Sequence, residues 1–167
     1  LERLASIDTA AFDKTGTLTL GLPRLSDVHV LSAAGDVGTS FDDASVELLA
    51  RAASLEQASS HPLGRAVVDA ARSRGLVLET PSSVRERAGR GISGNVAGRD
   101  ITIGARSLVA ELYPSLADDL PAADGDGLRA WIVEDGTLAG MLLFDELPRS
   151  GIADLMAGLR DLGVRRT

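Results

Sequence analysis

The sequence contains no cysteine, and aromatic residues and long apolar runs are scarce. Without cysteine, the chain can form neither a disulfide bond nor a thiolate metal site. Hydrophobic residues make up 44% of the 167 residues but aromatic residues only 3%, so the core must consist of Leu, Val, Ile and Ala. No apolar run approaches the roughly 18 residues of a membrane-spanning helix. The length suits one domain or two small ones.

Positive charge is also in deficit. The chain has 24 acidic and 17 basic residues, which gives a formal net charge of −7. This balance argues against nucleic acid or an anionic membrane surface as a partner, because neither would be attracted electrostatically. It is compatible with a nucleotide ligand, since a few local backbone N–H groups can hold a phosphate.

The hydrophobic pattern predicts both helices and strands. In the first half we expect a buried strand at 7–13, a strand at 25–32, a helix from Asp42 or Asp43 to about Ala58, and a helix from Pro62 to Gly75. In the second half we expect antiparallel strands around 92–103 with a turn at 97–99, a helix at 106–112, a hairpin at 128–145 turning at Asp135–Gly136, and a helix at 150–164. The expected fold class is α+β, with an antiparallel sheet flanked by helices.

The segment DKTGTLT, residues 13–19, places an aspartate directly after the first predicted strand. A carboxylate at the carboxyl end of a buried parallel strand faces the crevice where α/β sheets bind ligands. Asp13 can attack a phosphoryl group there and form an aspartyl-phosphate. Lys14, Thr15 and the N–H groups of the loop can neutralise the transferred phosphate. Phosphoryl transfer also calls for a divalent metal ion.

All seven residues of this segment resemble the phosphorylation signature of the P-type ATPases. The resemblance implies a haloacid dehalogenase-like phosphorylation domain in which Asp13 accepts the γ-phosphate of ATP. It also implies that Asp13 contributes to a Mg²⁺ site shared with residues outside this chain. Soluble phosphatases of that superfamily usually carry a second aspartate two positions after the nucleophile, where this chain has Thr15. Without that general base, water should attack the aspartyl-phosphate slowly.

A second motif lies between the first two predicted helices, where Glu56 precedes His61–Pro62 by five positions. Taken alone, a His-Pro pair is typical of a helix start. Together with DKTGTLT, it resembles the nucleotide-binding domain of the heavy-metal-transporting (type IB) P-type ATPases. The resemblance implies that Glu56 and His61 bind ATP. Ser60 departs from the family, which often has Glu directly before His-Pro.

A third motif, GRGISG at residues 89–94, matches the dinucleotide pattern G-x-G-x-x-G. That pattern requires a strand before it and a helix after it. A strand, turn and strand are predicted to follow here, so we reject a Rossmann site and leave a β-bulge or hairpin glycine pair as the alternative. The family resemblance instead implies that Gly89 and Gly91 let the backbone approach ATP, with Gly104 in the next segment. The family often has Asn where this chain has Ala105.

The segment beginning at MLLFDELPRSG resembles the return of the chain into the phosphorylation domain. Asp145 aligns with an aspartate that the family uses near the nucleotide phosphates, although a solvated strand end is an equal interpretation. The family usually has Arg three positions later. This chain has Pro148 there and Arg149 next, which leaves the role of the arginine open.

The resemblance predicts three parts: 1–22 begins the phosphorylation domain, 23–139 is the nucleotide-binding domain, and 140–167 returns to the phosphorylation domain, which is incomplete. The chain is interpreted as a cytosolic segment of an integral protein of the cell membrane. Its expected partners are ATP with Mg²⁺, a heavy-metal cation, and the remaining phosphorylation, actuator and transmembrane domains. By itself the segment is expected to bind ATP. The alternatives are a soluble aspartate-nucleophile phosphatase and a non-catalytic nucleotide-binding module.

Overall fold

The computed structural model describes residues 8–31, 37–38, 42–120 and 128–166. The chain divides into two compact units, which we call unit 1 (Leu1–Leu22 with Glu146–Thr167) and unit 2 (Pro23–Asp145). In chain order the elements are a π-helical turn η2 (Lys14–Leu18), β1 (Thr19–Leu31), β2 (Val37–Gly38), α1 (Asp43–Glu56), α2 (Pro62–Ser73), β3 (Ser82–Arg87), β4 (Gly91–Val96), β5 (Arg99–Gly104), α3 (Arg106–Leu112), a 3-10 turn η3 (Pro114–Leu116), β6 (Leu128–Glu134), β7 (Thr137–Pro148) and α4 (Ile152–Asp161).

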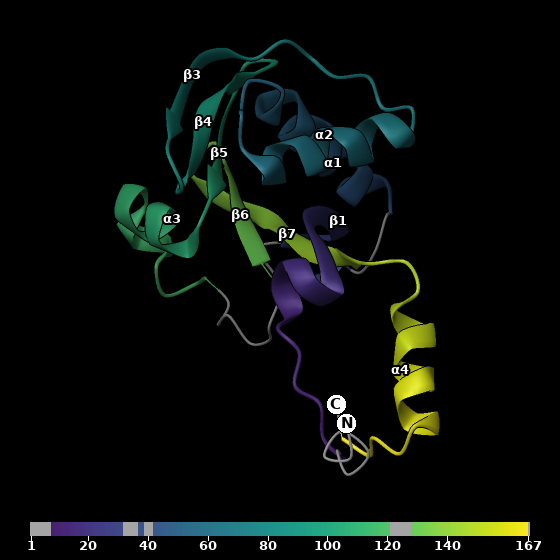
Figure 1. The fold of residues 1–167 in the computed structure, drawn as a ribbon. Coiled ribbons are helices and arrows are strands. Elements are labelled where there is room, and N and C mark those ends of the chain that lie inside the picture. The colour runs from purple at the N-terminus through teal and green to yellow at the C-terminus, as the bar shows by residue number, and fades with distance from the viewer. Residues whose placement is uncertain (1–7, 32–36, 39–41, 121–127, 167) are drawn as a thin grey trace. The chain divides into compact units, whose positions relative to one another are not determined.

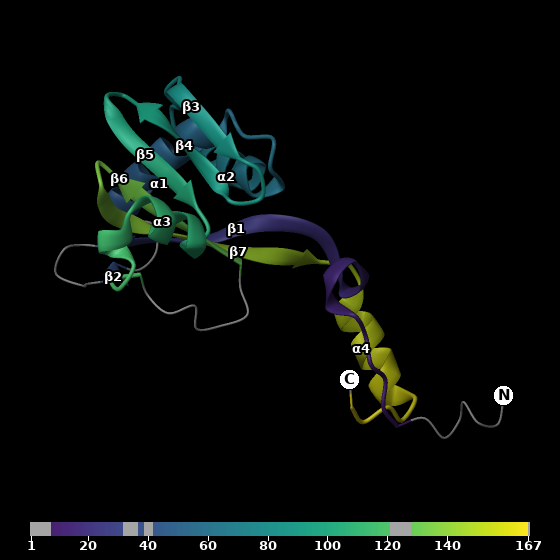
Figure 2. The ribbon, with the colours of Figure 1, turned by 90° about the vertical axis from the view of Figure 1, so that its left-hand side faces the viewer.

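The described strands form one seven-stranded sheet in the order β2-β1-β7-β6-β5-β4-β3. Pairing is antiparallel from β3 through β7 and between β1 and β2. In unit 2 the helices α1 and α2 lie together against one side of this sheet (Figures 1 and 2). The expected α+β fold with an antiparallel sheet flanked by helices is confirmed.

Strand β6 shows how the sheet separates two hydrophobic cores in unit 2. Ala130 and Ile132 belong to a large core that includes residues of α1 and α2, whereas Trp131 and Val133 belong to a smaller core with Val109 of α3. Successive side chains of a strand point to opposite faces, so a continuous apolar run supplies both cores at once.

The helix ends and tight turns of unit 2 follow the chemistry of their residues. Asp42 caps α1 by accepting a hydrogen bond from the Ser45 N–H at 2.9 Å. The β6–β7 turn has φ of +48° at Asp135 and +80° at Gly136. The β4–β5 turn likewise has positive φ at Ala97 and Gly98. Two consecutive positive φ angles are typical of type I′ hairpins, which match the twist of the flanking strands.

The predicted buried strand at 7–13 is wrong within its described part, residues 8–13. Only an isolated parallel bridge joins Thr9 to Arg166, and Ala11, Phe12 and Asp13 are exposed. An apolar run becomes a buried parallel strand only where neighbouring strands pair with it and layers cover its faces. The described residues supply one bridging residue, so this segment forms no strand.

Three other elements differ from expectation. The strand predicted at 25–32 begins earlier, at Thr19, and ends at Leu31. The helix predicted at 150–164 is shorter and covers Ile152–Asp161. Strand β3 was not predicted; its burial pattern shows no alternation because it is an edge strand with mostly exposed side chains.

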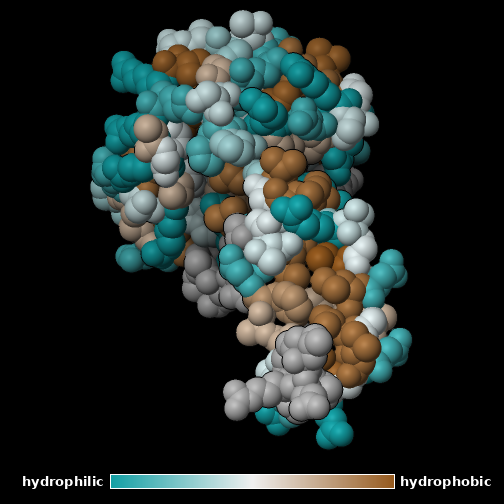
Figure 3. Space-filling view, viewed as in Figure 1, coloured by the Kyte–Doolittle hydropathy of each residue, from teal (hydrophilic) through white to brown (hydrophobic). Residues whose placement is uncertain are grey.

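Unit 1 carries much of its apolar surface on the outside. Helix α4 has no buried residue, and Figure 3 shows hydrophobic surface along it. Leu155 is 46% exposed and Leu162 is 81% exposed. In the part of the chain that the structure describes, no helix combines the length and apolar character needed to cross a bilayer.

Candidate functional site

The break between α1 and α2 positions the first two candidate residues in unit 2. Glu56 is the last residue of α1, and His61 is the N-cap of α2. Pro62 fits the first helical position because it lacks the N–H that would have no intrahelical acceptor there. The His61 Nδ1 accepts a hydrogen bond from the Leu63 N–H at 3.2 Å, in the manner of a capping Asn or Asp. This bond leaves the Nε2 edge of the His61 ring for another partner.

The β3–β4 turn brings the glycine motif to the same place. Gly89 and Gly91 of this motif are required for different reasons. Gly89 has φ of +69°, and a Cβ built on it would meet no atom within 4 Å. Gly91 pairs with Gly104 of β5, and its Cβ would lie 2.2 Å from the Ile103 carbonyl oxygen. Gly91 is therefore required by close strand packing, whereas Gly89 is required only by its backbone conformation.

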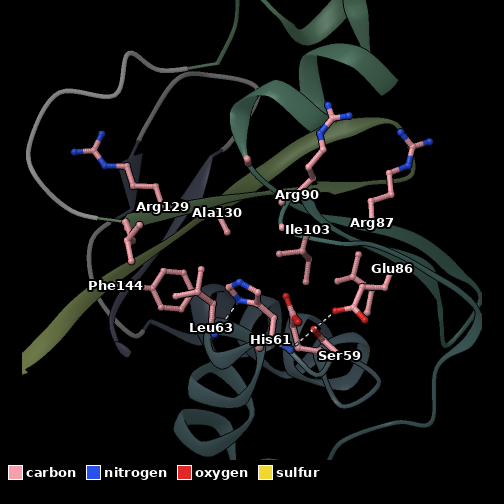
Figure 4. Close-up of a pocket in the computed structure, with 18 residues that line it drawn as sticks. Ser59, His61, Leu63, Glu86, Arg87, Arg90, Ile103, Arg129, Ala130 and Phe144 are labelled. Carbon is pink, nitrogen blue, oxygen red and sulfur yellow. Dashed lines mark hydrogen bonds between the residues drawn. The ribbon is translucent and has the colours of Figure 1, made fainter. Parts of the chain in front are cut away.

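These segments enclose a cavity of about 300 Å³ in unit 2, the lower end of the range for small-molecule sites. It is lined by Glu56, Ser59, His61, Leu63, Gly64, Glu86, Arg87, Gly89, Arg90, Gly91, Ile92, Ile103, Gly104, Ala105, Leu128, Arg129, Ala130 and Phe144. Figure 4 shows Leu63 and Phe144 near the His61 ring, and Ser59 and Glu86 together on another side. The cavity thus combines an apolar wall with a cluster of carboxyl and hydroxyl groups.

Five residues predicted from sequence motifs meet in this cavity: Glu56, His61, Gly89, Gly91 and Gly104. Ala105, where the family often has Asn, also lines it. Asp145 does not line it; its side chain is exposed at the end of unit 2, next to the cavity residue Phe144. That these residues bind a nucleotide stays a prediction at this point.

Ser59, Gly64 and Glu86 are among the cavity residues that the sequence analysis missed. A Cβ at Gly64 would lie 2.4 Å from Glu56 Oε2, so the absent side chain makes room for that carboxyl. The Ser59 hydroxyl donates a hydrogen bond to Glu86 Oε1 at 2.7 Å. Gly64 lies inside an amphipathic helix, where glycine is unfavourable and nothing in the local sequence calls for it. This unfavourable glycine was the one sequence signal that could have pointed to these residues.

The Glu56 carboxyl of the cavity has a raised pKa. It is 8% exposed, and its pKa is raised from 4.5 to about 7. Burial is the largest cause, because it penalises the charged form. The charge of Glu86 raises the pKa further, and hydrogen bonding with Ser59 lowers it. Glu56 therefore changes its protonation state close to neutral pH.

We expect this carboxyl to make stability fall as pH rises. Between pH 4.5 and about 7 the folded chain holds a proton that the unfolded chain has released, so the free energy of unfolding decreases with pH. The Glu56→Gln variant has no titrating carboxyl at this position. Its free energy of unfolding should therefore rise by on the order of 3 kcal/mol relative to that of the parent chain between pH 4.5 and 8. Denaturant unfolding at several pH values measures the difference. The exposed Glu79→Gln is the control, and parallel profiles for all three proteins would contradict the expectation.

In unit 1, the DKTGTLT segment forms the π-helical turn η2 and then enters β1, with Asp13 exposed before it. Arg149 holds this segment: its NH2 donates to the Gly16 carbonyl at 2.7 Å and its Nε to the Thr19 carbonyl at 3.2 Å. The Arg149 N–H also donates to the Leu18 carbonyl at 2.9 Å. Arg149, whose role the sequence left open, thus stabilises the turn that follows Asp13 through these hydrogen bonds.

A magnesium site cannot be built from this chain's described carboxylates. No group of three or more His, Cys, Asp or Glu residues suited to a metal ion occurs in ranges 8–31, 37–38, 42–120 and 128–166. Asp13 supplies a single carboxylate. The described residues thus do not fit Mg²⁺ as a complete site, and no step through the ion follows from them.

Comparison with known proteins identifies the protein family to which the chain belongs. The family model of the haloacid dehalogenase-like hydrolases matches residues 7–167, so the chain belongs to that family. Within it, the chain is 33% identical to the silver exporting P-type ATPase of Salmonella typhimurium and 34% identical to the copper-transporting P-type ATPase of Rhizobium leguminosarum bv. viciae. Each match covers 99% of this chain and 19% of the relative, so the chain spans about a fifth of their length.

A solved structure agrees with these relatives. A zinc-transporting PIB-type ATPase in its E2.Pi state superimposes with a TM-score of 0.73 at 30% identity, over 99% of this chain and 26% of that one. The predicted resemblance to heavy-metal P-type ATPases is therefore confirmed.

Proposed function

We propose that the chain is the ATP-binding and phosphorylation-site segment of a heavy-metal P-type ATPase, which drives a metal cation across a membrane. The observation that carries this proposal is the meeting of Glu56, His61, Gly89, Gly91 and Gly104 in one cavity of about 300 Å³. Motifs that lie up to 48 positions apart (104 − 56) in the sequence line the same space.

The cavity residues suit the base and sugar of a nucleotide. The His61 ring and Phe144 offer aromatic faces for stacking, and Leu63 adds apolar contact. Gly89 has open space around it and carries no side chain, so a ligand could approach its backbone. Together these groups can bind and orient ATP.

Asp13 is the proposed nucleophile. A carboxylate oxygen of Asp13 bonds to the γ-phosphorus, the bond from that phosphorus to the β–γ bridging oxygen breaks, and ADP leaves with the electron pair. Mg²⁺ would neutralise charge on the phosphates in the complete protein. Arg149 keeps the loop after Asp13 in place through its bonds to the Gly16 and Thr19 carbonyls. Thr15, in place of a second acid, leaves the aspartyl-phosphate without a general base and so long-lived.

The proposal extends to the whole protein as the resemblance implies. The segment would lie in the cytosol, joined to transmembrane, actuator and remaining phosphorylation domains, and the transported heavy-metal cation would be bound elsewhere in the protein. Units 1 and 2 would correspond to the phosphorylation and nucleotide-binding domains.

The test is a calorimetric titration of the 167-residue chain with ATP, with and without Mg²⁺. We expect His61→Ala to raise the Kd at least about tenfold, which corresponds to about 1.4 kcal/mol. Because His61 also caps α2, His61→Asn is the sharper variant, since Asn can still accept the Leu63 N–H bond but lacks the ring.

The matched control is His29→Ala, which removes the other histidine; His29 lies on β1, outside the cavity, and pairs with Asp27. Equal affinities for all four proteins would place the nucleotide elsewhere. A folded chain, by circular dichroism, that binds no ATP would refute the proposed function of the cavity.

A further inference from the structure

Two arginines of the cavity lining, Arg87 and Arg90, bind the same carboxylate of helix α3. Glu111 accepts a hydrogen bond from Arg87 Nη1 at 2.8 Å and another from Arg90 Nη2 at 2.6 Å. Arg90 Nη2 also donates to the Ser107 carbonyl at 3.4 Å. Hydrogen bonds from Arg90 and then Arg87 lower the pKa of the Glu111 carboxyl, so it is ionised at neutral pH. Two guanidinium groups and one carboxylate give this cluster an excess of positive charge.

The backbone at Arg90 is fixed, whereas its side chain lies at the surface. Arg90 stands between the two cavity glycines, Gly89 and Gly91, and its carbonyl accepts the Ala105 N–H at 2.9 Å. The side chains of the arginine–carboxylate cluster are 40% to 50% exposed. Exposed ion pairs contribute little because water screens them, and exposed side chains change rotamer readily. An anion in the cavity can therefore compete with Glu111 for Arg90 without a movement of the backbone.

The two arginines lie across the cavity from its apolar wall. Leu63 and Phe144 form part of that wall. Figure 4 shows Arg87 and Arg90 on the other side, with their guanidinium groups directed outward. A nucleotide whose base packs on the apolar wall extends its phosphates away from that wall. The two arginines thus lie on the side toward which the phosphates extend.

A chain of phosphates needs positive charge at this cavity. The whole chain has a formal net charge of −7, and the carboxyls of Glu56 and Glu86 line the cavity. A guanidinium group can donate two parallel N–H bonds to phosphate oxygens, and such charge-assisted bonds are stronger than those between neutral groups. A phosphate chain carries several negative charges, whereas Glu111 carries one. The phosphates are therefore the stronger partner for the two guanidinium groups.

We propose that Arg90, together with Arg87, binds the phosphate chain of the nucleotide, and that Glu111 holds both guanidinium groups outward until the phosphates replace it. The inference rests on the proposed function, because it takes a nucleotide as the ligand of this cavity. It makes Glu111 a competitor of the ligand, so its removal strengthens binding. A purely structural link between α3 and the β3–β4 turn predicts the opposite sign or no effect.

The experiment measures the affinity of the 167-residue chain for ATP and for adenosine by titration of amide resonances, which follows weak and tight ligands alike. Adenosine has the base and sugar of ATP but no phosphate, so the ratio of the two Kd values isolates the contribution of the phosphates. Glu111→Gln keeps the size of the side chain and removes its charge. We expect it to lower the Kd for ATP about fivefold and to leave the Kd for adenosine unchanged.

Variants of Arg90 test the other partner of the exchange. Arg90→Gln should raise the Kd for ATP about tenfold, again without an effect on adenosine. Arg90→Lys keeps the charge but loses the planar fork, so its Kd for ATP should fall between those of the parent and Arg90→Gln. The matched controls are Arg99→Gln and Glu79→Gln. Each removes an exposed charge outside the cavity and should behave as the parent.

Two results would overturn the inference while ATP binding by the parent chain leaves the proposed function intact. One is a Kd for ATP that is unchanged or higher in Glu111→Gln, which would make Glu111 a structural link alone. The other is an equal loss of affinity for ATP and adenosine in Arg90→Gln, which would indicate an altered cavity instead of a lost phosphate contact. A folded parent chain that binds neither ligand would overturn both the inference and the proposed function.

Discussion

Replacing Gly91 by alanine is expected to destabilise the chain by roughly 3 kcal/mol or more, because overpacking and backbone strain each contribute about 1–3 kcal/mol. The new Cβ would lie 2.2 Å from the Ile103 carbonyl oxygen and 2.6 Å from the Gly104 Cα. Both are backbone atoms of the paired strand β5 and cannot move aside as a flexible side chain could. The φ of +149° at Gly91 adds strain for any other residue.

Gly89→Ala is the matched control, two positions away in the same motif. Its Cβ would meet no atom within 4 Å, and only the left-handed φ of +69° is unfavourable, so the expected cost is about 1–2 kcal/mol. Unfolding by denaturant, followed by circular dichroism, compares the two variants. If Gly91→Ala proved as stable as Gly89→Ala, the close packing of β4 on β5 could not be the reason for the second glycine.

This contrast shows what the sequence could and could not predict about the site. The family resemblance of the G-x-G motif predicts Gly89 and Gly91 at a nucleotide site, and both line the cavity. The motif did not reveal that Gly91 and Gly104 meet across paired strands, since register is a property of the folded sheet. Ser59 and Glu86 were missed for a related reason: they lie 27 positions apart and are joined only when β3 approaches the end of α1.

The fold was predictable where a local signal decides the structure. The turn at Asp135–Gly136 and the starts of α1 and α2 depend on residues within a few positions, and they fall where the sequence placed them. Strand β3 and the segment 8–13 depend on what pairs with them. Charged residues in β3 concealed a strand that β4 stabilises, and apolar residues near Asp13 predicted a strand that lacks the neighbours to form.

Glu134→Ala is expected to have the second large effect on stability. Arg51 of α1 donates to both carboxylate oxygens of Glu134, with Nε at 2.6 Å and NH2 at 3.1 Å, and the Glu134 side chain is only 9% exposed. Removing one partner of a buried pair leaves the other charge without compensation, which costs about 3–5 kcal/mol in a fully buried site. Since the Arg51 side chain is 26% exposed, we expect about 2–3 kcal/mol here.

A double-mutant cycle separates the free energy of the Arg51–Glu134 interaction from that of the contacts around it. Arg51→Met with Glu134→Leu removes both charges and should recover most of the loss, because an apolar pair of similar volume needs no partner. Glu47→Ala is the control: Glu47 is 75% exposed and lies 3.6 Å from Arg51, so its removal should cost less than about 0.5 kcal/mol. The measurement is the free energy of unfolding of each variant. A Glu134→Ala cost as small as that of Glu47→Ala would mean that water replaces Glu134 at Arg51, and that packing of the large core alone holds α1 on the sheet.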